Sequence, residues 1–182
     1  MLGLLRRNLY KCQPSVKEIA YNTLVSPKVE YCASVCDPYT TTNIDEFEMV
    51  QRRAARFVKS DYRREPGVVT ERLSSLKWQS LAKRRMAARL TMMYKTVHGL
   101  VDSNTDVLLD EQATQIREGS LPSTYRRILA RKAVYSESFF PRTVSECNTL
   151  PGELRAAASV DKFKSGLLHI DLGHLRQDSH HD

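Results

Sequence analysis

The chain has 182 residues, and its 28 lysines and arginines against 21 aspartates and glutamates give a formal net charge of +7. Its 41% hydrophobic and 27% charged residues are typical of one globular domain and argue against a disordered or fibrous protein. No apolar run exceeds three residues, whereas a membrane span needs about 20, so we expect no transmembrane helix.

The N-terminus and the cysteines bear on the compartment. Residues 1–5 form a very short apolar stretch that Arg6 and Arg7 follow, the reverse of the order in a secretory signal. Four cysteines, at 12, 32, 36 and 147, are too few and too scattered for a disulfide scaffold. We therefore expect an intracellular protein, with nucleus and cytoplasm left open.

The first half of the chain has mostly helical periodicity. Residues 15–35 predict two short helices broken at Ser26-Pro27, because proline suits the first turn of a helix. The clearest helix is predicted over 44–59, with Asn43 as N-cap and Glu46 as its capping-box partner. Its apolar stripe places three basic residues on the opposite side: Arg52, Arg56 and Lys59.

Two more helices are predicted before residue 101. Thr70 is a candidate cap for a short helix over 71–76, and Ser80 for a long helix over 81–98 that Gly99 ends. One face of the long helix is apolar: Met86, Leu90, Met93, Tyr94 and Val97.

The second half is less regular. Residues 102–124 are polar and aperiodic, and 125–140 are ambiguous between helix and strand. Pro141 is expected to begin a short helix that runs through Asn148, and Ser159 to cap a last amphipathic helix. The tail from His174 is expected to be disordered.

Positive charge is concentrated in two stretches. Residues 51–64 hold six basic residues and one acid, and residues 72–101 hold seven basic residues and no acid. Arginine suits phosphate because its fork of donors matches phosphate oxygens, although a merely solvated helix face is the alternative. The candidate phosphate contacts are Arg52, Arg53, Arg56, Lys59, Arg84, Arg85 and Arg89.

Signals for metal binding or catalysis are weak. Cys32 and Cys36 could share a helix face, but two ligands do not make a zinc site, and half-buried packing is the simpler role. No Gly-rich phosphate loop, nucleophile elbow or zinc-protease helix is present. Polymerase chemistry needs paired carboxylates that hold two metal ions, and no such pair is recognisable. We expect no metal site and no catalysis by this chain alone.

Eight short stretches occur in a specific order: residues 2–9 (LGLLRRNL), 17–31 (KEIAYNTLVSPKVEY), 37–40 (DPYT), 48–58 (EMVQRRAARFV), 76–78 (LKW), 81–85 (LAKRR), 138–143 (SFFPRT) and 148–151 (NTLP). In this order and spacing they resemble the region just after the reverse transcriptase core of jockey-like, LINE-type non-LTR retrotransposon polyproteins. The resemblance covers residues 2–165.

The resemblance implies a parent protein with an endonuclease, a reverse transcriptase palm and fingers, and this C-terminal part. The catalytic aspartates of the family lie upstream, so none is carried over, and Mg²⁺ would belong to that palm. This chain looks like the helical thumb and the segment beyond it. The implied partners are an RNA/DNA template–primer, gripped by its backbone, and the palm of the parent polymerase. A membrane or a small-molecule substrate is not expected.

Two departures from the family pattern stand out. Cys36 and Cys147 occupy positions where the family usually has tryptophan. Together with a start at Met1, inside the polymerase, they suggest a decayed or truncated element copy.

The predicted fold is mainly α. It comprises a thumb-like basic helical bundle over 1–101, a polar linker or arm over 102–134, a small C-terminal helical segment over 135–173 and a disordered tail over 174–182. Two functional alternatives remain open beside nucleic-acid binding. One is a protein-interaction module with an apolar groove around Trp78, Met92 and Tyr94. The other is a relic of a mobile element without a function of its own.

Overall fold

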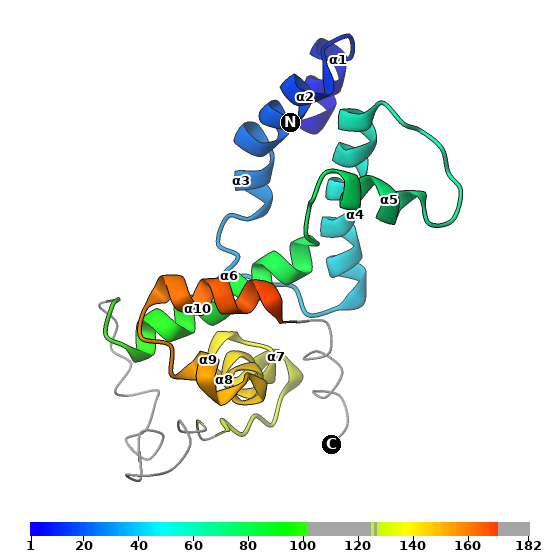
Figure 1. The fold of residues 1–182 in the computed structure, drawn as a ribbon. Helices are drawn as coiled ribbons and strands as arrows, with labels where there is room; N and C mark the ends of the chain where they lie inside the picture. The colour runs from blue at the N-terminus through cyan, green and yellow to red at the C-terminus, as the bar shows by residue number, and fades with distance from the viewer. Residues whose placement is uncertain (102–124, 126, 171–182) are drawn as a thin grey trace. The chain divides into compact units, whose positions relative to one another are not determined.

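The computed structural model describes residues 1–101, 125 and 127–170, and these residues form helices and no strand. The prediction of a mainly α fold is therefore confirmed (Figure 1). None of the described helices is long and apolar enough to cross a membrane. The helices in chain order are α1 (Leu2–Asn8), α2 (Pro14–Leu24), α3 (Ser26–Val29), α4 (Thr41–Lys59), α5 (Val68–Ser75), α6 (Leu81–Val97), α7 (Ala133–Ser136), α8 (Phe139–Thr149), α9 (Gly152–Arg155) and α10 (Val160–His169).

The chain divides into two compact units. The first comprises Met1–Cys32 and Pro38–Arg85, and the second comprises Ala33–Asp37 and the described residues from Met86 onward. The boundary between the units thus falls within α6, whereas the sequence placed its first boundary at residue 101. The predicted segments remain predictions, and residues 102–124 and the tail from His174 lie outside the described residues.

The core of the first unit lies between α1, α2 and α4. Its buried side chains are Leu5, Tyr21, Val25, Ala54, Phe57 and Val58. Trp78 packs on this core, with its ring stacked on Tyr21 at a centroid distance of 4.6 Å. The indole Nε1 donates a hydrogen bond to Glu18 Oε1 at 3.0 Å. The stretches 17–31 and 76–78 therefore meet in one cluster.

α4 begins earlier than the sequence predicted. Thr40, rather than Asn43, is the N-cap, because the Thr40 hydroxyl accepts a hydrogen bond from the Asn43 backbone N–H at 3.4 Å. The helix ends at Lys59, as predicted, and Ser60 follows in the left-handed conformation, with φ of 52°. The Ser60 hydroxyl accepts a hydrogen bond from the buried Lys17 ammonium at 2.7 Å.

The caps of α5 and α6 show where local signals succeed and fail. Gly67, at φ of 85°, is the N-cap of α5, so the helix starts before the predicted Thr70 cap. The Ser80 hydroxyl accepts from the Lys83 backbone N–H at 3.2 Å, as expected for a cap of α6. Gly99 follows that helix at φ of 63°, which confirms the predicted stop.

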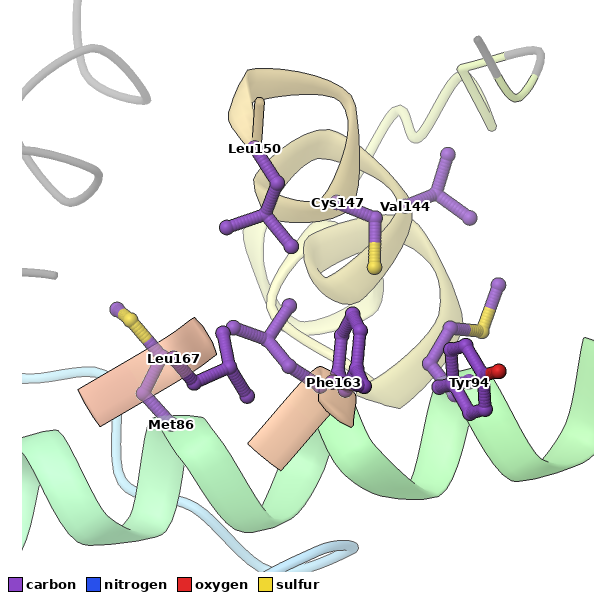
Figure 2. Close-up of a cluster of buried hydrophobic side chains, with 9 residues drawn as sticks. Met86, Tyr94, Val144, Cys147, Leu150, Phe163 and Leu167 are labelled. Atoms are coloured by element: carbon purple, nitrogen blue, oxygen red, sulfur yellow. The ribbon is translucent and has the colours of Figure 1, made fainter. Parts of the chain in front are cut away.

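The core of the second unit joins α6, α8 and α10. Its buried side chains are Met86, Leu90, Met93, Tyr94, Val144, Cys147, Leu150, Phe163 and Leu167. Figure 2 shows these side chains converging, with Phe163 of α10 beside Tyr94 of α6. The two rings stack at 4.6 Å, and the Tyr94 hydroxyl donates to the Ala157 carbonyl oxygen at 2.5 Å. The apolar face predicted for the long helix is therefore the one that packs.

Two predictions in this unit have clear outcomes. The described part of 125–140 forms no strand; it contains α7 and the start of α8, which begins at Phe139 rather than Pro141. Proline at the third helical position fits because the first N–H groups of a helix have no internal partner. Ser159 caps α10 as predicted, since its hydroxyl accepts from the Lys162 backbone N–H at 3.3 Å.

Candidate nucleic-acid interface

The outer side of α4 carries four of the predicted phosphate-binding residues, Arg52, Arg53, Arg56 and Lys59, which we call the α4 basic face. At about 100° per residue they span roughly 120° of the helix surface. The opposite side is buried in the core of the first unit through Ala54, Phe57 and Val58. This division explains how the helix can present cations while its apolar stripe packs.

Most cations of the α4 basic face have no internal partner. Arg53 and Lys59 are exposed, and no carboxylate among the described residues pairs with Arg53, Arg56 or Lys59. Arg52 lies 3.6 Å from Asp45, a loose ion pair between exposed groups. Such a surface pair is worth about 0–1 kcal/mol and competes weakly with a phosphate. The Arg56 Nε is buried and has no hydrogen-bond partner in the described part of the chain.

Basic residues also follow α4, in the segment before α5. Arg64 is exposed, whereas Arg63 binds Asp61 through its Nε at 3.1 Å and its Nη2 at 2.9 Å. The buried Arg72 also donates to Asp61, at 3.0 Å. Hydrogen bonds from Arg63 and then Arg72 hold the pKa of Asp61 well below its usual range. This carboxylate therefore organises the turn, and Arg63 is not free for phosphate.

Arg84 and Arg85 lie in the first two turns of α6 and make contacts within the first unit. Arg84 is partly exposed and pairs with Glu30 at 2.6 Å. Arg85 is buried, donates to the Val29 carbonyl oxygen at 2.7 Å and lies 4.8 Å from the centre of the Phe47 ring. An arginine held in this way stabilises packing and does not face a ligand.

Arg89 is the most deeply buried of the predicted contacts, with 1% of its surface exposed. It binds Asp37 and Glu146, and both carboxylates are almost fully buried. Arg142 lies 3.3 Å from Asp37 and 3.4 Å from Glu146, and also 3.7 Å from the less buried Glu137, so the network in the second unit comprises two arginines and three acids. The stretches 37–40 and 138–143 meet there. Because Arg84 is paired with Glu30 and Arg85 and Arg89 are buried, we leave all three out of the proposed interface.

The cysteines lie in different environments. Cys147 is buried in the core of the second unit, whereas Cys32 and Cys36 are exposed. Cys32 has a left-handed backbone, with φ of 54°, in a turn after α3, so the expected shared helix face does not form. Burial raises the pKa of Cys147 to about 12, which keeps its thiol protonated. Within the described residues, no group of three or more His, Cys, Asp or Glu side chains could hold a metal ion.

The apolar groove expected around Trp78, Met92 and Tyr94 does not gather these three residues in one cluster. Trp78 packs in the first unit, and Tyr94 is buried in the core of the second. Met92 is partly exposed.

Comparisons with protein-family models, with curated proteins and with solved structures gave no match to this chain. Its functional assignment therefore depends on its own residues and on the ordered stretches described above.

Proposed function

We propose that this chain is the thumb and post-polymerase region of a non-LTR retrotransposon reverse transcriptase, and that it binds a template–primer through phosphate contacts. The proposed interface is the α4 basic face. No catalytic step is assigned to this chain, and the Mg²⁺ of the polymerase reaction would belong to the palm.

The unpaired cations of the α4 basic face are the observation that carries this proposal. Arg53, Arg56 and Lys59 lie on one side of a helix whose other side is buried, and no described carboxylate neutralises them. A regular helix presents such charges at a fixed spacing, which suits the regular phosphates of a duplex. These contacts carry no base sequence information, so binding should be sequence-independent.

The ordered stretches support the family part of the proposal. Two pairs of them meet inside the folded units, Glu18 and Tyr21 with Trp78, and Asp37 with Arg142. The motifs are thus tied to one another by packing and ion pairs across long sequence separations. A set of residues that is spatially coupled in this way is expected to persist together in an ordered pattern.

The test is binding of the full chain to a labelled RNA–DNA primer–template across a salt series. Each phosphate contact contributes about 0.9 to the slope of log K against log salt. The triple variant Arg53→Gln, Arg56→Gln, Lys59→Gln should therefore lower the slope by about 3. The matched control is Arg6→Gln, Arg7→Gln, Lys28→Gln, which removes the same charge from exposed positions outside α4.

The outcomes separate the possible functions. A salt slope that is lowered in the α4 variant but not in the control supports the proposed interface. Equal decreases of the slope in both variants would show an effect of net charge alone and would contradict the interface. Addition of nucleotides in the presence of Mg²⁺ and deoxynucleotides would contradict the absence of a catalytic role. No binding at low salt by a folded chain would refute the proposed function.

A protein-interaction module is the second candidate, and one observation favours it. Val16 and Ile19, three residues apart on α2, are 45% and 63% exposed, and Leu4 of α1 is 48% exposed. Val16 and Ile19 lie about one helical turn apart, and contiguous exposed apolar side chains mark interaction surfaces. Association with a protein that is insensitive to salt and lost in Ile19→Ser would favour this function.

A further inference from the structure

A pocket of about 250 Å³ opens in the first unit, and no residue of the α4 basic face lines it. It lies where α2, the segment between α5 and α6, and the first turn of α6 come together. Its lining is Tyr21, Asn22, Lys77, Trp78, Gln79 and Arg84. A bound water occupies about 30 Å³ of liquid volume, so the space suits several waters or one small ligand.

Aromatic rings and fixed side chains make the pocket wall rigid. Trp78 stacks on Tyr21, and its N–H is held by Glu18. One arm of the Arg84 guanidinium is held by Glu30 at 2.6 Å. Glu30 in turn accepts a hydrogen bond from the Ser26 hydroxyl at 2.5 Å. A ligand would therefore meet groups whose positions are already fixed, which reduces the entropic cost of binding.

Three polar groups of the lining could still bind an acceptor. The Tyr21 hydroxyl is buried beside the Arg84 guanidinium, which interacts with it as a cation and hydrogen-bond donor, so the hydroxyl proton is left to donate. The Arg84 Nε is buried without a hydrogen bond to a described residue. Lys77 is exposed, and no described carboxylate pairs with it. A buried donor left without an acceptor destabilises the fold, so a ligand that supplies acceptors would recover this loss.

The charge of the lining favours an anion. No carboxylate belongs to the lining; Lys77 is a cation without a described carboxylate partner, and Arg84 is a second cation whose charge is partly offset by its ion pair with Glu30. The acids around the lining are engaged: Glu30 pairs with Arg84, Glu18 accepts from the indole, and Glu48 accepts from the Ala82 backbone N–H at 2.8 Å. Burial raises the pKa of Tyr21, against the lowering effect of Arg84, so the phenol stays protonated at neutral pH and can donate.

The backbone of Lys77 caps the end of α5. Its φ is 54°, in the left-handed region that lysine rarely occupies. The Lys77 backbone N–H donates to the Ser74 carbonyl oxygen at 2.9 Å, which holds the turn after α5. The Trp78 backbone N–H donates to the Leu73 carbonyl oxygen at 2.9 Å, which completes a regular helix C-cap. This cap fixes the backbone position of Lys77 in the pocket lining.

We propose that this pocket binds the phosphate group of a small phosphate ester, such as a nucleoside monophosphate. The phosphate would accept hydrogen bonds from Tyr21 and Arg84 and would pair with Lys77. This proposal goes beyond the α4 interface and does not depend on it, because none of the lining residues belongs to α4. It also differs from the expectation that the chain has no small-molecule ligand.

Trp78 provides the readout, because it is the only tryptophan of the chain and forms part of the pocket wall. Adenosine monophosphate, inorganic phosphate and adenosine are titrated against the full chain, with indole emission followed and equilibrium dialysis as an independent measure. Saturable binding of the monophosphate and of phosphate, with adenosine at least tenfold weaker, is the expected result. Equal binding of adenosine and the monophosphate, or no binding by the folded chain in either assay, would overturn the proposal.

Two variants and a matched control locate the site. Lys77→Asn removes the charge while asparagine tolerates the left-handed backbone, and it should weaken monophosphate binding about tenfold. Tyr21→Phe removes the buried hydroxyl while the ring still packs on Trp78, and it should weaken binding severalfold. Lys83→Gln, on α6 but outside the lining, should change nothing. Unchanged binding in both pocket variants, or an equal loss in Lys83→Gln, would contradict the assignment.

Discussion

Replacing Arg89 by methionine is the sharpest test of the buried ion network. Arg89 binds Asp37 and Glu146, and all three side chains are at most 3% exposed. Removing one partner of a buried ion pair lowers the free energy of unfolding by about 3–5 kcal/mol, because the remaining charge is left buried without a counter-charge. Arg142 remains within 3.4 Å of both acids, so we expect the lower end, about 3 kcal/mol.

The assay is urea unfolding followed by far-ultraviolet circular dichroism. With an m value of about 2 kcal/mol/M, a loss of about 3 kcal/mol shifts the midpoint down by roughly 1.5 M. Arg53→Met, at an exposed position of α4, is the control and should stay within about 0.5 kcal/mol. The double variant Arg89→Met, Glu146→Met leaves Asp37 with Arg142 and should be more stable than Arg89→Met alone. A single-variant loss under about 1 kcal/mol, or a double variant less stable than the single, would refute the reasoning.

Three further predictions concern single groups. Tyr94→Phe should lower stability by about 1 kcal/mol in urea, because it removes a hydrogen bond to a backbone carbonyl, and an unchanged midpoint would argue against that bond. The pKa of Cys147 is raised from 9.0 to about 12, so the free energy of unfolding should decrease as the pH rises from 9 toward 12 and the buried thiol is forced to ionise. In Cys147→Val this decrease should be less steep over the same pH range. The pKa of Asp61 is lowered by Arg63 and Arg72, so stability should fall as the pH drops below 3.8, and Asp61→Asn, measured by thermal unfolding, should flatten that acid limb.

Much of the fold could be predicted from periodicity because the apolar stripes of α4 and α6 are strong. Met86, Leu90, Met93 and Tyr94 pack as predicted, and Ser159 caps the last helix. The N-cap of a helix is harder to predict where several polar residues are adjacent in the sequence. The run of threonines before α4 is typical of a loop in sequence, yet the Thr40 hydroxyl finds a backbone N–H and starts the helix earlier.

The candidate site was predicted only in part, because charge alone does not reveal burial. Arg53 and Lys59 are exposed, as a phosphate contact requires, whereas Arg85 and Arg89 are buried. Arg89 has its acidic partners 52 and 57 residues away along the chain, so no local pattern could connect them. An arginine on a helix that packs on more than one side is ambiguous until those distant partners are known.

The pocket around Trp78 could not be predicted from the sequence. Its lining comes from three separate segments, and no spacing rule links Tyr21 to Lys77 or Arg84. The one available signal was the single tryptophan next to a lysine. A single tryptophan next to a lysine is as typical of a packed core residue as of a ligand-binding site. The structure shows that Trp78 stacks on Tyr21.

The most direct test of the central claim is the salt dependence of primer–template binding by the α4 triple variant and its charge-matched control. The account predicts a slope lowered by about 3 when Arg53, Arg56 and Lys59 are neutralised, and a much smaller change when the exposed charges outside α4 are neutralised. Identical slopes for the α4 variant and the unaltered chain would contradict it.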